Sequence, residues 1–185
     1  MAAMMRDFGG QLRGERHRRR VRRRRVLAVG LLGLALGTTI VLPPRPILVW
    51  NASASAPVGL YGVDAGAAVA LGDIVIARAP EPFRSFAARR HYLPANVPLV
   101  KRVVAVAGDS VCAPGRIVRV NGRSAAARRS FDGQGRALPW WRGCRTLRDG
   151  ELFLLMDHPD SFDGRYFGPV ARGAVIGRAR PLWTR

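Results

Sequence analysis

Lysine, acidic residues, histidine and cysteine are all scarce in this chain of 185 residues. It has 31 lysine and arginine residues against 12 aspartate and glutamate residues, and Lys101 is its only lysine, so arginine carries nearly all of the +19 net charge. The two cysteines and three histidines (His17, His91 and His158) are scattered and lack the paired spacing of a four-ligand site, so we expect no structural zinc module. Apolar residues make up 48% of the chain, too many for a disordered basic protein, so we expect one domain of modest size.

The charge that is present is concentrated at the N-terminus. Residues 1–25 contain ten arginines and two acidic residues, a local net charge of +8, whereas the remaining 160 residues carry 21 basic and 10 acidic groups. The next 17 residues, 26–42, read VLAVGLLGLALGTTIVL and include no charged residue. At ~1.5 Å per residue this segment covers about 26 Å of helix, the lower limit for crossing a hydrocarbon core. We therefore predict a basic tail at 1–25, a transmembrane anchor at 26–42 and an exported domain at 43–185.

The arginine run fixes the expected orientation of this anchor. By the positive-inside rule the tail stays in the cytoplasm and the rest of the chain is exported, so the lipid bilayer is an expected partner. A nucleic-acid-binding arm is the rival interpretation of such a run, but its position directly before an apolar helix favours the membrane, and we expect no nucleic acid partner. Residues 52–54, Ala-Ser-Ala, resemble a signal-peptide cleavage site. They lie well beyond the apolar segment, with three prolines between, so we favour a retained anchor over a cleaved signal.

The exported part has the pattern of a mainly β domain. Short runs rich in β-branched residues and bounded by glycine or proline predict strands at 72–79, 97–107, 117–120, 151–156 and 174–179. The Asn121-Gly122 pair after the third run predicts a tight hairpin, because both residues tolerate positive φ. Residues 80–96 and 123–149 are expected to be loops, and no amphipathic helix of three turns is predicted.

Both cysteines, Cys112 and Cys144, lie in the exported part. Two cysteines in an oxidising compartment most simply pair, and closing a loop of about 33 residues would stabilise the fold by roughly 3 to 4 kcal/mol. Two separate buried thiols are the alternative.

The single lysine is informative because the chain uses arginine everywhere else. Lysine can lose its proton near neutral pH, whereas arginine stays charged. On an alternating strand Lys101 shares a face with Leu99, Val103 and Ala105, and burial on such an apolar face lowers the pKa of an amine, as a general base requires. An exposed lysine at a strand edge fits the spacing equally well.

A neutral lysine base needs a nucleophile, and two serines lie just beyond the predicted anchor. Ser53 and Ser55 belong to residues 51–62, a segment short of bulky side chains and rich in turn formers. A serine there can lie exposed beside an extended peptide. By composition alone the segment is also typical of an ordinary linker.

Three segments in this order resemble the conserved boxes of type I signal peptidases. They are residues 55–61 (SAPVGLY), 100–109 (VKRVVAVAGD) and 161–168 (SFDGRYFG). The resemblance is closer to the TraF-type peptidases of conjugative transfer systems, whose serine box runs S-x-P-x-G-[LW]-Y. It extends from the predicted anchor at residue 26 to about residue 180.

This resemblance implies a Ser-Lys protease with a signal-peptidase-like β domain on one transmembrane helix. Such enzymes are single-pass proteins of the inner membrane, with a cytoplasmic N-terminus and a periplasmic catalytic domain, and they use no metal or cofactor. Ser55 matches the nucleophile and Lys101 the general base. Ser53 matches the serine whose hydroxyl joins the Ser55 N–H in the oxyanion hole.

The third box supplies the groups expected to support this dyad. Ser161 matches the hydroxyl that orients the lysine amine, and Asp163 and Arg165 match a supporting charged pair. Gly164 departs from the family pattern, which has serine between the two, so the backbone of this box is expected to differ.

The function implied is removal of leader peptides from membrane-inserted precursors, above all a propilin of a conjugation apparatus. In the TraF-type group the acyl-enzyme can also be intercepted by an amine, which joins the ends of the pilin into a ring. A general type I signal peptidase is one alternative. A non-enzymatic, membrane-anchored scaffold of a secretion or mating channel is an alternative of another class.

Overall fold

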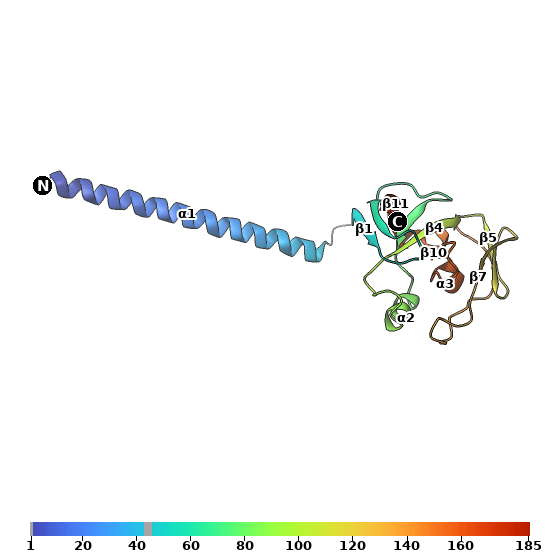
Figure 1. Ribbon diagram of the computed structural model, residues 1–185. Helices are drawn as coiled ribbons and strands as arrows, with labels where there is room; N and C mark the ends of the chain where they lie inside the picture. Colours follow the sequence, from blue (N-terminus) through green and yellow to red (C-terminus); the bar gives the residue numbers. More distant parts are fainter. Residues whose placement is uncertain (1, 43–45) are drawn as a thin grey trace. The chain divides into compact units, whose positions relative to one another are not determined.

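The computed structural model describes the backbone of residues 2–42 and 46–185, with side chains from residue 18 onward. The chain divides into two compact units, Met1–Pro44 and Arg45–Arg185 (Figure 1).

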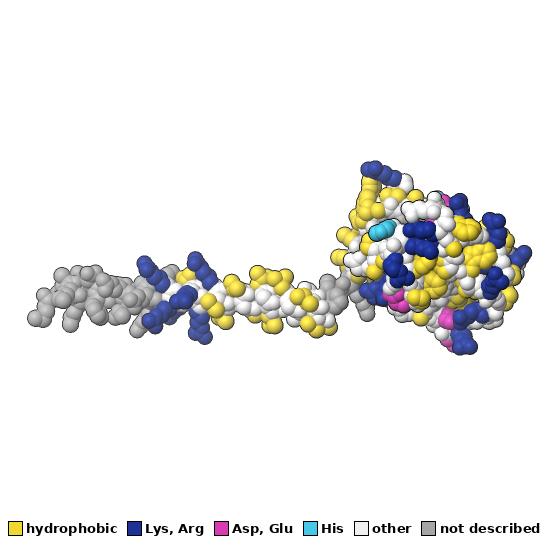
Figure 2. All heavy atoms as spheres, turned by 90° about the horizontal axis from the view of Figure 1, so that it is seen from below, with side chains coloured by type: hydrophobic (Ala, Val, Ile, Leu, Met, Phe, Trp, Pro, Cys, Tyr) yellow, Lys and Arg dark blue, Asp and Glu magenta, His cyan; other side chains and the backbone are white. Residues whose placement is uncertain are grey.

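The first unit is one long helix, α1 (Ala2–Val41), which contains both the arginine-rich segment and the apolar segment. Its part Arg18–Val41 is long and apolar enough to cross a membrane, by length and composition. Its large apolar side chains, from Val26 to Val41, are exposed, and Figure 2 shows them beyond the arginines. An apolar surface of this kind needs a nonaqueous partner, as the predicted anchor requires.

The second unit is built mainly from β-strands arranged in two antiparallel sheets. The strands are β1 (Leu48–Asn51), β2 (Gly59–Asp64), β3 (Ile74–Ala77), β4 (Leu99–Ala105), β5 (Ser110–Ala113), β6 (Ile117–Val120), β7 (Arg123–Ala127), β8 (Gly143–Thr146), β9 (Glu151–Leu155), β10 (Val170–Ala171) and β11 (Val175–Thr184). Three short helical segments complete it: α2 (Phe83–Arg89), α3 (Gly164–Phe167) and the 3₁₀ turn η1 (Arg172–Ala174). The prediction of a mainly β domain is confirmed.

The larger sheet has seven strands in the order β1-β2-β11-β3-β4-β9-β10. β4 lies in its interior, with β3 and β9 as hydrogen-bonded neighbours. Buried residues of these three strands, such as Val75, Val103 and Leu154, form the main hydrophobic core. The sheet therefore fixes both the backbone and the surroundings of every β4 side chain.

The smaller sheet has four strands in the order β7-β6-β5-β8 and packs its buried face on a second core around Val111 and Phe153. Cys112 on β5 lies directly opposite Cys144 on β8, and the two form a disulfide, which confirms that prediction. Asn121 and Gly122 both have positive φ in the β6–β7 turn, as the hairpin prediction requires.

Four of the five predicted strands contain an observed strand, and the fifth, 174–179, covers only the first half of β11. The predicted loops were partly wrong. Segment 123–149 contains β7 and β8, and segment 80–96 contains the two-turn helix α2. Residues 51–62, expected to be turn-rich throughout, end in β2. The strands among these elements have weak local signals and are held by pairing with their neighbours in the two sheets.

Candidate active site

The structure brings Ser55, Lys101 and Ser161 together from three distant parts of the chain. Lys101 Nζ lies 3.2 Å from Ser55 Oγ and 2.8 Å from Ser161 Oγ. β4 positions the lysine, and Ser161 follows β9, the neighbouring strand of the sheet. Ser55 lies in the turn between β1 and β2. A hydroxyl and an amine in hydrogen-bond contact, with a second hydroxyl orienting the amine, have the geometry for proton transfer.

The surroundings of Lys101 favour its neutral form. Its side chain is only 2% exposed, so the structure decides against the exposed lysine at a strand edge. Burial lowers the pKa of Lys101 to about 8, while the negative charge of Asp163 opposes this shift and the positive charge of Arg165 adds to it. An amine with this pKa is in part unprotonated at neutral pH and can accept a proton.

Ser53 lies beside Ser55, where the oxyanion hole is expected. The Ser53 and Ser55 hydroxyl oxygens are 3.0 Å apart, and the Ser55 N–H donates to Ser53 Oγ over 3.3 Å. Both expected oxyanion donors are thus adjacent to the nucleophile. In this state the backbone N–H is directed at Ser53, so an incoming carbonyl oxygen must compete with the Ser53 hydroxyl for it.

Asn51, which the sequence patterns did not single out, shapes the turn that carries both serines. It is the last residue of β1 and is buried. Its Nδ2 lies within 2.9 to 3.1 Å of the carbonyl oxygens of Ser53, Ala56 and Pro57, and its Oδ1 accepts from the Ser53 N–H. One side-chain amide therefore replaces the backbone partners that the turn lacks. In the sequence, the available signal for this role was the presence of an asparagine shortly before the serine box.

Asp163 and Arg165 form a buried ion pair behind the lysine. Arg165 Nε and Nη2 lie 2.8 and 3.1 Å from the two Asp163 carboxylate oxygens, and both side chains are at most 2% exposed. Arg165 also donates to the carbonyl oxygens of Ala127, Met156 and Pro159, so all five guanidinium N–H groups have an acceptor. A fully bonded pair of this kind fixes the loop that carries Ser161.

The glycine that departs from the family pattern has a steric cause. A Cβ atom on Gly164 would lie 2.7 Å from the backbone oxygen of Leu154 and 2.8 Å from a ring carbon of Phe153. The start of α3 therefore packs directly on β9, with no room for a side chain. The charged pair on either side of Gly164 is intact, and the backbone is compact at this point.

The glycine of the serine box also has a structural reason. Gly59 opens β2 with φ of +153°, and a Cβ atom there would lie 2.0 Å from the Trp183 carbonyl oxygen on β11. Two residues later, Tyr61 is buried and donates its hydroxyl to the Pro57 carbonyl oxygen over 2.8 Å. Gly59 and Tyr61 of the serine box thus anchor the turn to the large sheet.

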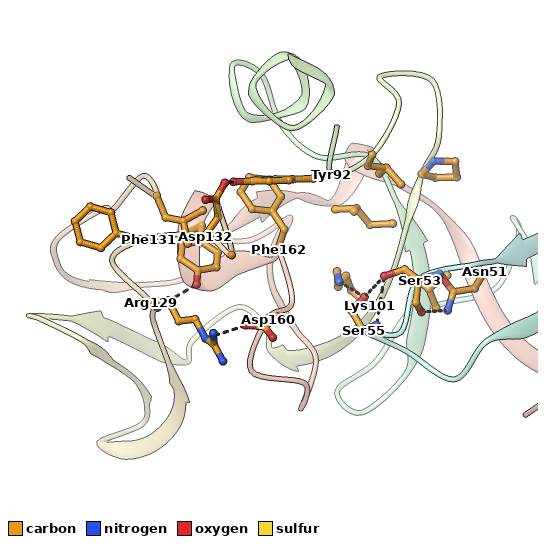
Figure 3. A pocket seen from close by; sticks show the side chains of 17 residues that line it. Asn51, Ser53, Ser55, Tyr92, Lys101, Arg129, Phe131, Asp132, Asp160 and Phe162 are labelled. Atoms are coloured by element: carbon orange, nitrogen blue, oxygen red, sulfur yellow. Dashed lines mark hydrogen bonds and ion pairs between the residues drawn. The ribbon is translucent and has the colours of Figure 1, made fainter. Parts of the chain in front are cut away.

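A cavity of about 300 Å³ opens on the reactive groups, and we call it the lysine pocket. Ser53, Ser55 and Lys101 lie together at one end, and Tyr92 and Asp132 lie farther along it (Figure 3). Apolar side chains, including those of Leu93, Leu99 and Phe162, form much of its lining. This pocket suits an extended peptide with small or apolar side chains.

A second, more open depression of about 600 Å³ shares only Ser55 with the lysine pocket. We call it the arginine pocket, because Arg102 and Arg185 contribute to its lining. Residues 54–58 of the serine box and residues 156–158 form the rest.

Comparison with known proteins places these features in a family context. A family model described as signal peptidase, peptidase S26, matches residues 19–183, which is most of the chain. Among solved structures, a signal peptidase I from Enterococcus faecalis V583 matches with a TM-score of 0.37 and 21% identity over 60% of this chain and 97% of that chain.

Three curated relatives are named for conjugal or plasmid transfer. A conjugal transfer protein TraF from Agrobacterium fabrum is 33% identical and covers 84% of this chain and 93% of that protein. A plasmid transfer protein TraF from Escherichia coli is 38% identical over 72% of this chain and 81% of that protein. A probable conjugal transfer protein TraF from Sinorhizobium fredii is 36% identical over 72% and 76%.

Proposed function

Because the chain belongs to the peptidase S26 family of signal peptidases, in its TraF-type group, we propose that it is a membrane-anchored serine endopeptidase with a Ser55–Lys101 dyad. Its substrates would be exported precursors that carry a leader peptide, above all the propilin of a conjugation apparatus. The observation that supports this most directly is the 3.2 Å contact between Ser55 Oγ and the buried amine of Lys101.

The proposed reaction begins with proton transfer from serine to lysine. Neutral Lys101 Nζ takes the proton of Ser55 Oγ as that oxygen attacks the scissile carbonyl carbon. The tetrahedral intermediate collapses, the C–N bond breaks, and Lys101 returns the proton to the leaving amine. Water, or an amine of the substrate that closes a ring, then attacks the acyl carbon and gives a proton to Lys101. The ester C–O bond to Ser55 breaks, and Lys101 returns the proton to Ser55 Oγ.

Ser53 and the Ser55 N–H supply the proposed oxyanion hole. The hydrogen bond that now joins them has to open so that both can donate to the oxyanion. Each such donor is worth roughly 3 to 4 kcal/mol of the activation barrier. Ser161 Oγ accepts a hydrogen bond from the Lys101 amine and so holds it near Ser55. The Asp163–Arg165 pair keeps Ser161 in place.

The proposed location is the inner membrane. The apolar part of α1, from residue 26 onward, would span the bilayer with the basic tail in the cytoplasm, and the β domain would work on the periplasmic side. A precursor that is itself inserted in the membrane presents its cleavage site near the same surface, so tethering the enzyme there raises the local substrate concentration.

The proposal is tested by producing the full chain together with a candidate propilin and measuring the mass of the pilin product. Wild type should remove the leader, and a product lighter by one water than the cleaved linear form would identify ring closure. Ser55→Ala and Lys101→Arg should abolish processing while the β domain stays folded, because alanine has no nucleophile and arginine cannot act as a base.

The same variants separate the enzyme from a scaffold. A non-enzymatic component of a mating channel needs no base at residue 101 and would keep its function with Lys101→Arg. Normal pilin processing by that variant would therefore contradict the Ser55–Lys101 dyad. Cleavage of many unrelated signal-peptide-bearing proteins at equal rates would instead favour a general signal peptidase.

A further inference from the structure

The two pockets meet at Ser55 and reach β4 at neighbouring positions. Residues 99–101 line the lysine pocket, and Arg102 lines the arginine pocket. Ser55 is the only lining residue that the pockets share. A peptide whose scissile carbonyl lies at Ser55 Oγ therefore enters one pocket with the residues before the scissile bond and the other with the residues after it.

The chemistry of the two linings assigns these sides. The lysine pocket is the narrower and has apolar walls next to Lys101, which suits small residues before the scissile bond. The arginine pocket is larger and more open, and two arginines line it, so we assign the leaving side to it.

The arginine pocket is lined by side-chain donors. Arg102 and Arg185 supply two guanidinium groups. His158 Nδ1 accepts the Asp160 N–H over 3.2 Å, so the neutral ring carries its proton on Nε2, which is a further donor. The single carboxylate of the lining, Asp157, is 84% exposed and lies 3.1 Å from Arg102 Nη1.

This balance leaves the pocket with positive charge and unused donors beside the nucleophile. Counting side chains alone, Asp157 offsets one guanidinium, and no other acidic side chain of the described residues lines the pocket. Planar guanidinium groups bind carboxylates with paired hydrogen bonds, which gives both attraction and orientation.

We propose that the arginine pocket binds a carboxylate carried by the residues that follow the scissile bond, and so selects precursors with an acidic leaving segment. The carboxylate can belong to an acidic side chain or to the end of a short leaving peptide. This inference rests on the proposed peptidase function, because it takes Ser55 as the point of cleavage.

Binding is measured first, with the full Ser55→Ala chain in detergent, so that cleavage does not interfere. The probes are fluorescent synthetic peptides with Ala-x-Ala before the scissile bond and either Glu or Gln at the second position after it, each ending in a free carboxylate or an amide. We expect the peptides that carry a carboxylate to bind about 10-fold more tightly than the Gln amide, the effect of one charge-assisted contact. Comparing Glu amide with Gln acid identifies which source of carboxylate is used.

Variants assign the effect to the pocket. Arg102→Gln combined with Arg185→Gln should remove the preference, whereas Arg148→Gln, an exposed arginine outside both pockets, should retain it. Asp157→Asn should strengthen it, because Arg102 loses its competing partner. Equal binding of all four peptides, or a preference unchanged in the double variant, would overturn the inference, as would a preference for Glu moved to the other side of the scissile bond.

Cleavage of the same peptides by the wild-type chain separates this inference from the proposed function. Charge-dependent binding with no cleavage of any peptide would uphold the pocket and count against the peptidase. Cleavage of all four peptides with equal kcat/KM would uphold the peptidase and overturn the pocket.

Discussion

At the scale of single residues, one amine determines how this site responds to pH. In the proposed mechanism Lys101 must be neutral to accept the proton of Ser55, and burial lowers its pKa to about 8. We therefore predict that kcat/KM rises as pH increases through about 8 and then levels off, which a pH profile on a peptide substrate would show. A profile that stays flat from pH 6 to pH 9 would contradict a lysine base with this pKa.

The same lowered pKa implies a cost in stability. The unfolded chain keeps Lys101 near its ordinary pKa of 10.5, so between about 8 and 10.5 the unfolded state binds more protons and stability rises with pH. Lys101→Met removes this dependence. We expect the variant to be more stable than wild type below pH 8, by at most on the order of 3 kcal/mol, with the difference shrinking toward pH 10.5. Urea unfolding at several pH values measures this, and a difference that grows with pH would refute it.

Asn51 is a positioning residue whose loss should affect turnover. Asn51→Asp keeps the size of the side chain but sets carboxylate oxygens against the carbonyl oxygens of Ser53, Ala56 and Pro57. The turn then shifts, and we expect kcat to fall by 10- to 100-fold with a smaller change in KM. The thermal unfolding midpoint of the variant shows whether the domain remains folded, and an unchanged kcat would exclude the positioning role.

Gly164 gives the sharpest steric test. Gly164→Ala places a methyl group against the Leu154 backbone oxygen, which cannot move without disturbing β9, so we expect a loss of about 1 to 3 kcal/mol in unfolding free energy. Gly173→Ala is the matched control, because a Cβ there meets no atom within 4 Å. Equal unfolding midpoints for the two variants would show that the close contact with Leu154 does not reduce stability.

At the scale of elements, local sequence predicted some strands and missed others for identifiable reasons. β4 and β9 are runs of β-branched and large apolar residues that are buried in the large sheet, so their pattern is visible in the sequence. β7 (RSAAA) and β8 (GCRT) have mostly exposed side chains and weak strand propensity, and their pairing with β6 and β5 decides their conformation. Pairing of this kind depends on the whole fold and leaves little mark on the sequence.

The residues of the candidate site likewise include some that the sequence predicted and some that it did not. Lys101 was singled out as the only lysine, and Ser55 as a serine just beyond the anchor; motif resemblance then assigned their roles and added Ser161. Asn51 was missed because its contacts are with backbone carbonyl oxygens, which every residue has. Whether Lys101 is buried also could not be decided from strand alternation, because that depends on which strands flank β4.

The disulfide gives a prediction for the smaller sheet. It joins two strands that are 32 residues apart, so Cys112→Ser with Cys144→Ser should lower the unfolding free energy by about 3 kcal/mol on the chain-entropy model. Neither cysteine lines the lysine pocket, so peptide cleavage at low temperature should persist. A reductant should destabilise wild type and leave the double variant unchanged, and equal sensitivity of the two would argue against this role.

At the scale of the whole molecule, the +19 charge separates into parts with different meanings. Of this total, +8 lies in residues 1–25, ahead of the apolar part of α1. The arginines of the β domain lie scattered over the face seen in Figure 2, with few acidic side chains among them. The total charge therefore specifies no single ligand. Arg102 and Arg185 matter for the proposed carboxylate binding because they lie beside Ser55.

The interior place of the only lysine has a last consequence, for how the chain is digested. A protease that cuts only after lysine has one possible site, and that bond lies in β4, hydrogen-bonded to strands on both sides. Cleavage into fragments 1–101 and 102–185 therefore requires the large sheet to open, and its rate measures the population of opened molecules. We expect this rate to rise with urea in step with global unfolding, whereas an arginine-specific protease cuts the folded chain at its exposed sites. Lys101, the proposed general base, is thus also a reporter of whether the large sheet is intact.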